Sequence, residues 1–180
     1  MGSLRTRFSL VVATVALFIA MLVLNEWLFK QLEFAPGINW VYLPAGTRLL
    51  CTLLFAEAGA IGLLLVSWGV SFLWFFPHDF TRAFVGGIVA ALAPYLVFRF
   101  ARNRYGLANS LASLTPQRLL VLSVAYALAS PLLHHVWFAL EGQGALLQGF
   151  TAMFVGDLLG TLIVLYGMKM VLSLVQRRNA

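Results

Sequence analysis

The chain has 180 residues, of which 62% are hydrophobic and only 10% are charged, and its formal net charge is +6. Soluble domains have roughly a quarter of their residues charged, and a soluble chain of this length could not bury so much apolar surface in its own core. The composition therefore excludes a soluble enzyme, a disulfide scaffold and a disordered chain. It indicates a single integral membrane domain over residues 1–180.

Long apolar runs predict the helices that cross the membrane. Each crossing needs about 20 apolar residues, so we expect an all-α polytopic bundle of about six transmembrane helices. In chain order the expected spans are residues 8–24, 42–55, 61–76, 82–98, 118–138 and 146–174. The run over residues 42–76 is too long for one span, and its middle segment, Ala56-Glu57-Ala58-Gly59-Ala60, is the expected turn.

Charged residues and tryptophans orient the six predicted helices. Six spans place both termini on one side, together with most of the basic residues: Arg5, Arg7, Arg99, Arg102, Arg104, Arg118, Lys169, Arg177 and Arg178. Cytoplasmic loops are enriched in Lys and Arg, so we expect both termini in the cytoplasm. Tryptophans belong at the interfaces, and four fall near the outer ends: Trp27, Trp40, Trp74 and Trp137. Because the basic residues flank helices, the net charge indicates headgroup contact and no nucleic acid.

Small residues predict where helices pack closely. In lipid, helix association depends on small residues that let backbones approach one another. The fourth predicted helix contains Gly86, and the sixth contains a Gly-x-x-x-Gly step at Gly156 and Gly160. Further glycines of the sixth helix are spaced so that they lie close to the same face. We expect packing within the chain, and a seam in a homo-oligomer is the alternative.

The sequence places a few ionisable residues at membrane depth. Such residues are costly there and usually face the bundle interior. They are Arg48, Glu57, His134, His135 and Asp157. Counting from the helix ends at ~1.5 Å per residue, Arg48 falls near the outer surface and Asp157 near the middle of the membrane. We expect Arg48 and Asp157 to pair. The pair is either a structural link between two helices or part of an outward-facing ligand pocket lined by His134.

Metal and catalytic motifs are missing from the sequence. His134 and His135 are adjacent, so they point about 100° apart on a helix and cannot both face one metal. Cys51 is the single cysteine, which excludes an internal disulfide. There is no G-x-S-x-G, H-E-x-x-H, phosphate-loop or C-x-x-C motif. We therefore expect no enzymatic activity, no cofactor and no metal.

Two segments of the sequence carry a family resemblance. The first is Leu43-Pro44-Ala45-Gly46, followed by Leu54-Phe55, and the second is Phe154-Val155-Gly156-Asp157-Leu158-Leu159-Gly160. In this order they resemble the membrane-associated sensor (MASE) domains of bacterial signalling proteins, over about Asn39 to Tyr166. Residues that match the family's pattern are Pro44, Gly46, Gly156, Asp157 and Gly160. The resemblance implies a multi-pass sensory module of a bacterial inner membrane, normally fused to an output domain.

The expected function follows from the resemblance and from the few polar residues in the spans. The sequence ends at Ala180, so we expect a non-enzymatic sensor-like module or subunit whose output comes from a partner membrane or cytoplasmic signalling protein. Two alternatives remain open. One is the substrate-binding membrane component of a small-molecule transporter, which would bring an ATPase pair. The other is an accessory subunit that packs into a larger membrane complex without a ligand.

Overall fold

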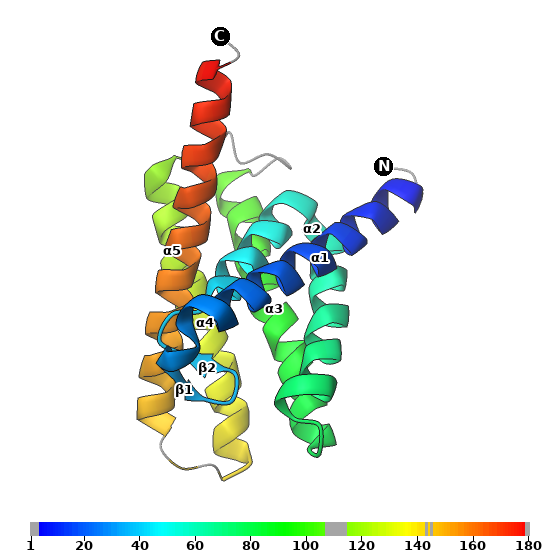
Figure 1. Cartoon of the computed structure of the whole chain (residues 1–180), viewed down its shortest axis with the longest axis vertical. Helices are drawn as coiled ribbons and strands as arrows, with labels where there is room; N and C mark the ends of the chain where they lie inside the picture. The colour runs from blue at the N-terminus through cyan, green and yellow to red at the C-terminus, as the bar shows by residue number, and fades with distance from the viewer. Residues whose placement is uncertain (1–3, 107–114, 143, 145, 179–180) are drawn as a thin grey trace.

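The computed structural model describes residues 4–106, 115–142, 144 and 146–178. Its elements in chain order are α1 (Leu4–Phe29), the short 3-10 helix η1 (Lys30–Leu32), the strands β1 (Glu33–Ala35) and β2 (Ile38–Asn39), α2 (Leu43–Val70), the π-helix η2 (Ser71–Phe75), α3 (Phe80–Tyr105), α4 (Pro116–Leu140) and α5 (Leu146–Arg178). The five α-helices pack into a bundle in which α2 contacts α1, α3 and α5 (Figure 1).

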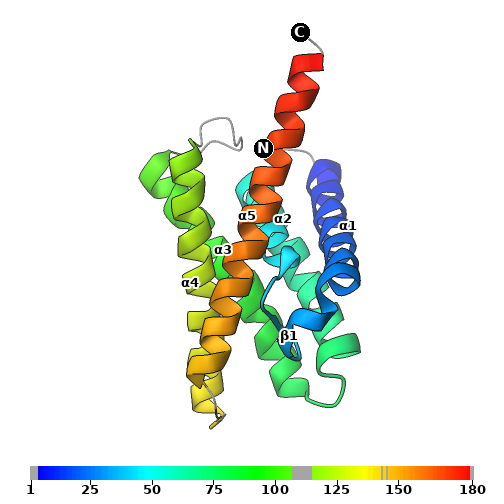
Figure 2. The same cartoon turned by 60° about the vertical axis from the view of Figure 1, so that its left-hand side comes forward.

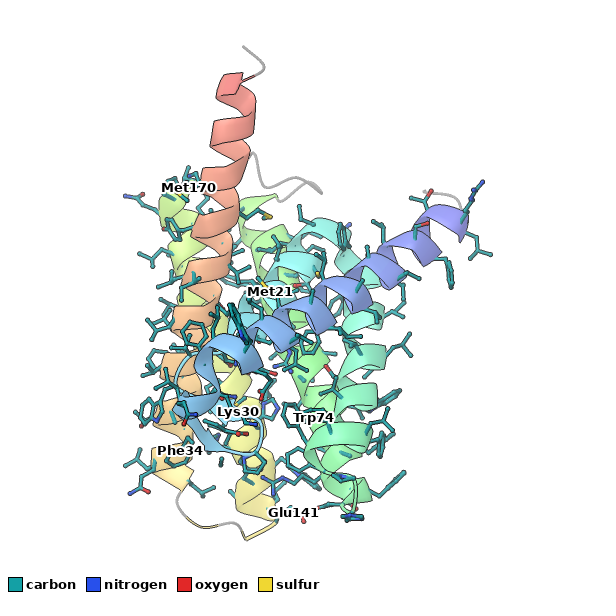
Figure 3. All side chains as sticks on the ribbon, viewed as in Figure 1. Met21, Lys30, Phe34, Trp74, Glu141 and Met170 are labelled. Carbon is teal, nitrogen blue, oxygen red and sulfur yellow. The ribbon has the colours of Figure 1, made fainter. Side chains whose placement is uncertain are left out.

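The two ends of the bundle differ in charge and structure. We call the end where α1 begins and α5 finishes the basic end; it carries Arg5, Arg102 and Lys169 (Figure 1). We call the opposite end the hairpin end, because the antiparallel strands β1 and β2 lie in this half of the bundle. Met170 and Glu141 mark the two ends in Figure 3. One exposed ion pair at the basic end joins Arg102 to Glu57 at 3.6 Å.

Five helices in the described part of the chain, rather than six, are long and apolar enough to span a membrane. The predicted second and third spans form one broken element, α2. The first half of α2, Leu43–Phe55, has 13 residues and is therefore about 20 Å long. The hydrocarbon core of a bilayer is about 30 Å thick, so this half is too short to cross it.

The break in α2 lies at Ala56, inside the turn that the sequence predicts. Ala56 has φ 51° and ψ −125°, a conformation outside the helical region. The chain doubles back there, and the two halves of α2 run in opposite directions (Figures 1 and 2). Gly59 lies directly against the carbonyl group of Cys51. A side chain at Gly59 would collide with that backbone, so glycine permits the tight reversal.

The first half of α2 begins inside the bundle. The N–H of Tyr42 donates to the carbonyl oxygen of Gly156 at 3.1 Å, and Gly160 lies against the backbone of Tyr42 and Leu43. The part of α5 that is long and apolar enough to cross a membrane is Leu146–Met170. The contact is near the middle of this part. The segment from β1 to Tyr42 therefore re-enters the bundle from the hairpin end, and we call it the re-entrant segment.

A side chain of α1 satisfies the buried start of α2. The Oδ1 atom of Asn25 accepts a hydrogen bond from the N–H of Leu43 at 2.8 Å, and Asn25 is fully buried. The first N–H groups of a helix have no partner within the helix, and inside a membrane each one must find a partner elsewhere. Asn25 thus stabilises a helix start that would otherwise be costly at this depth.

Replacing Asn25 with alanine is expected to lower the free energy of unfolding by about 1–3 kcal/mol, the cost of a buried group that loses its hydrogen-bond partner. Unfolding in mixed micelles on SDS titration, followed by tryptophan fluorescence, measures the change. Leu28→Ala, an exposed site on the same helix, is the control and should change stability by only about 0.5 kcal/mol. Equal stability of the two variants would contradict the assigned role of Asn25.

Candidate functional site

A cavity with a few polar lining residues lies inside the bundle, in the half nearer the hairpin end. Its volume is about 60 Å³, which is on the order of the space of two water molecules in the liquid. Residues of α1, the β1–β2 hairpin and all four later helices contribute to its wall. Its polar lining includes Arg48, Ser67, Ser71, Arg82, His134 and Trp137. No Asp or Glu is among the lining residues in the described part of the chain.

Arg48 reaches the cavity from the first half of α2. The side chain is only 7% exposed, and its guanidinium carbon lies 5.2 Å from the ring centre of Phe18 and 5.4 Å from that of Tyr42. Aromatic faces attract cations at such distances. Arg48 lies deeper than the spacing from Pro44 predicts, because α2 begins near the middle of α5 and not at the membrane surface.

Asp157 lies close to Arg48 without forming a direct ion pair. Asp157 is 1% exposed and interacts electrostatically with Arg48, but no N–O contact within ion-pair distance joins these two described residues. Asp157 follows Gly156, which lies against the re-entrant segment just before α2. Helix N-termini carry partial positive charge, so both Arg48 and the start of α2 favour the carboxylate.

Two residues of α4 complete the buried network around Arg48. Tyr126 is fully buried and its hydroxyl group interacts with both Arg48 and Ser130. Ser130, also fully buried, interacts with Asp157 as well. Yet Tyr126 Oη, Ser130 Oγ and Asp157 Oδ2 complete no hydrogen bond of regular geometry. The network therefore links three helices. Arg48 of α2 is the positive charge, Asp157 of α5 is the negative charge, and α4 supplies two hydroxyl groups.

The two adjacent histidines have different surroundings. The Nδ1–H of His134 donates to the carbonyl oxygen of Ser130 at 2.8 Å, since a carbonyl can only accept. His134 lines the cavity. His135 instead makes edge contacts with the rings of Phe138 and Phe150. The described residues contain no group of three or more His, Cys, Asp and Glu side chains that could hold a metal.

Several residues of the cavity could not be recognised from the sequence. The guanidinium carbon of Arg82 lies 4.3 Å from the ring centre of Phe76 and 5.5 Å from that of Phe138. Ser67 and Trp137 were also missed. The sequence offered two signals: a serine within an apolar run, and a basic residue followed by small residues. Neither signal distinguishes a cavity wall from an ordinary helix face.

The small residues predicted for packing fall into two groups. A Cβ atom at Gly46 would lie 2.8 Å from the carbonyl oxygen of Gly160, and Gly156 lies directly against the carbonyl oxygen of Asn39. Pro44 is in the first turn of α2, where its missing N–H is tolerated. The expectation for Gly86 needs correction. A Cβ atom there would meet nothing within 4 Å, and the neighbouring Gly87 packs against Trp68 instead, because Gly86 faces the cavity.

Four polar atoms of the cavity lining are buried without a hydrogen-bond partner. They are Arg48 Nε, Arg82 Nε, Trp137 Nε1 and Ser67 Oγ. Buried polar groups are normally paired, and an unpaired one needs an explanation. No protein-family model, curated protein or solved structure matches the chain, so the geometry of this cavity is the basis for assigning a function.

Proposed function

We propose that the protein is a sensor-like membrane module that holds a small polar ligand in the cavity and passes its occupancy to a partner protein. The observation that carries the proposal is that four of the unpaired buried polar atoms, two of them arginine nitrogens, line one cavity. Polar groups at membrane depth are expensive and usually serve a function. The resemblance of the segments around Pro44 and Asp157 to membrane-associated sensor domains supports the same proposal.

The buried network supplies a route from the cavity to the helices. Arg48 lines the cavity and also interacts with Tyr126 of α4 and Asp157 of α5. A ligand that draws the guanidinium group toward the cavity weakens these two interactions, and it thereby changes how α4 and α5 are held against α2. Beyond the other helices α5 projects from the basic end (Figures 1 and 2), so a shift of α5 reaches the surface where a partner can bind.

The proposal includes an orientation in a bacterial inner membrane. The basic end faces the cytoplasm, in keeping with the enrichment of Lys and Arg on that side, and the hairpin end faces outward. The cavity is then open to ligands from outside the cell, while both chain ends and the projecting part of α5 face cytoplasmic partners. The protein acts without enzymatic chemistry of its own.

Thiol labelling tests whether the cavity is reached from the outer side. In a Cys51→Ala background, Ser71→Cys in the cavity wall is expected to react with a membrane-impermeant methanethiosulfonate added to spheroplasts. Ser123→Cys is the matched control, because Ser123 is fully buried outside the cavity and should stay unreacted. Arg104→Cys at the basic end should react only after the membrane is permeabilised. Protection of Ser71→Cys in intact spheroplasts would contradict the proposal.

A further inference from the structure

The cavity lining has the chemistry of an anion site. Two arginines line it, Arg48 and Arg82, and no carboxylate among the described residues faces it. The unpaired atoms Arg48 Nε, Arg82 Nε and Trp137 Nε1 are all donors, and Ser67 supplies a hydroxyl group that also donates. Arginine and indole nitrogens cannot accept hydrogen bonds. A single ligand that satisfies all of them must therefore present several acceptor oxygens.

Arg48 needs an acceptor oxygen more than an exposed arginine would, because it is buried. Its side chain is 93% buried, from an exposed fraction of 7%, and its Nε atom has no partner. Asp157, which is not among the lining residues of the cavity, offsets part of its charge. The N–H groups of a guanidinium form a planar fork that suits the paired oxygens of a carboxylate or phosphate. An unused Nε–H therefore leaves part of such a fork open.

Arg82, from α3, is also free to bind an anion in the cavity. The nearest carboxylate in sequence, Asp79, accepts a hydrogen bond from the backbone N–H of Arg82 at 2.9 Å and caps α3. The guanidinium group itself is held between Phe76 and Phe138, and Arg82 Nε has no partner. The aromatic rings fix the orientation of the group without neutralising its charge.

From this arrangement we propose that the ligand of the cavity carries an oxyanion, a phosphate or carboxylate group, bound between Arg48 and Arg82. The proposal rests on the function proposed above and names the chemical class of its ligand. Ser67 and Trp137 donate to the remaining oxygens. The small volume of about 60 Å³ fits one such group and excludes a large ligand from the cavity itself.

The oxyanion has two sources, a free ion and the headgroup of a lipid. An apolar groove of about 780 Å³ runs between α1 and the second half of α2, and Val70 lines both the groove and the cavity. Lys30 and Trp74 lie on the two sides of this groove (Figure 3). A lipid whose chain follows the groove could place its phosphate in the cavity, so both sources belong in the experiment.

The experiment measures thermal unfolding of the full chain in dodecyl maltoside, a detergent without charge. One arm adds inorganic phosphate, with sodium chloride at equal ionic strength as the blank. The other adds phosphatidylglycerol, with diacylglycerol as the blank because it has the same chains and no phosphate. Because a ligand that binds the native state stabilises it, we expect a rise in Tm over the blank in at least one arm. The responding arm identifies the source.

Variants assign the response to the cavity. Arg82→Gln should weaken the apparent affinity about 10- to 100-fold, which corresponds to one lost charge-assisted hydrogen bond. Arg82→Lys, which keeps the charge without the fork, should lie between Arg82→Gln and the wild type. Arg104→Gln makes the same charge change at an exposed site of the basic end and should bind as the wild type does. Trp137→Phe gives a second test that does not alter charge.

Two results would overturn the proposal: no rise in Tm in either arm, or an equal rise for Arg82→Gln and the wild type. Either result, combined with labelling of Ser71→Cys from outside, would leave the ligand-binding module standing and remove only the anionic class of its ligand. Protection of Ser71→Cys would instead remove the outward-facing module itself.

Discussion

Replacing Arg48 with methionine is expected to lower the free energy of unfolding by about 3–5 kcal/mol, the range seen when one member of a buried charge pair is removed. Asp157 is only 1% exposed, so the substitution leaves its carboxylate buried without the nearby positive charge. SDS titration in mixed micelles measures the loss. Arg102→Met is the control, because its ion pair with Glu57 is exposed and exposed pairs contribute at most about 1 kcal/mol.

A double-mutant cycle tests whether the loss arises from Asp157. Adding Asp157→Asn to Arg48→Met removes the uncompensated carboxylate, so the double variant should be more stable than Arg48→Met alone. Coupling energies between interacting residues are about 0.5–3 kcal/mol. Additive effects would show that Arg48 and Asp157 do not stabilise each other. If Asp157→Asn alone changed neither stability nor any partner-dependent output, the route from the cavity to α5 would also be contradicted.

Replacing Gly156 with alanine is expected to destabilise the protein by about 1–3 kcal/mol, as overpacking commonly does. A Cβ atom at Gly156 would collide with the backbone carbonyl of Asn39, and a backbone atom in the re-entrant segment cannot move aside as the end of a flexible side chain can. Thermal unfolding in detergent measures the effect, and proteolysis of the hairpin reports whether the re-entrant segment is released.

Gly167→Ala is the matched control for Gly156→Ala, on the same helix. A Cβ atom at Gly167 would meet nothing within 4 Å. Alanine is a better helix former than glycine by about 1 kcal/mol, so this variant should be as stable as the wild type or slightly more so. A Gly156→Ala variant that behaves like Gly167→Ala would show that the re-entrant segment does not pack against α5 as described.

The class of the protein and the positions of most helices could be predicted from the sequence, because long apolar runs and flanking charges report membrane helices directly. The turn after Phe55 was also readable, since Glu57 and Gly59 interrupt an apolar run that is too long for one span. These signals depend on composition within a short window. They do not require any knowledge of which segments meet in space.

The depth of α2 could not be predicted in this way. Residues 43–53 are apolar except for a few polar side chains, and they are buried throughout. Such a run reads as the start of a span whether it begins at the membrane surface or in the middle of the bundle. Its true depth depends on Asn25, Gly156 and Gly160, which lie far from it in sequence. For the same reason the sequence placed Arg48 too near the surface.

The docking of the re-entrant segment also has a consequence for biogenesis. Asn39 of this segment lies against Gly156, 117 positions later in the chain, so the surface that receives the segment is made long after the segment itself. The first half of α2, which follows this segment, has 13 residues and is too short to form an independent span. Asn25 of α1 can already pair with the N–H of Leu43, but the N–H of Tyr42 lacks its partner Gly156 until α5 is made. We therefore expect this start to stay at the translocation machinery or the membrane surface until α5 is inserted. In the final step of assembly, an early segment of the chain thus packs against a late one, and the cavity forms only after that step.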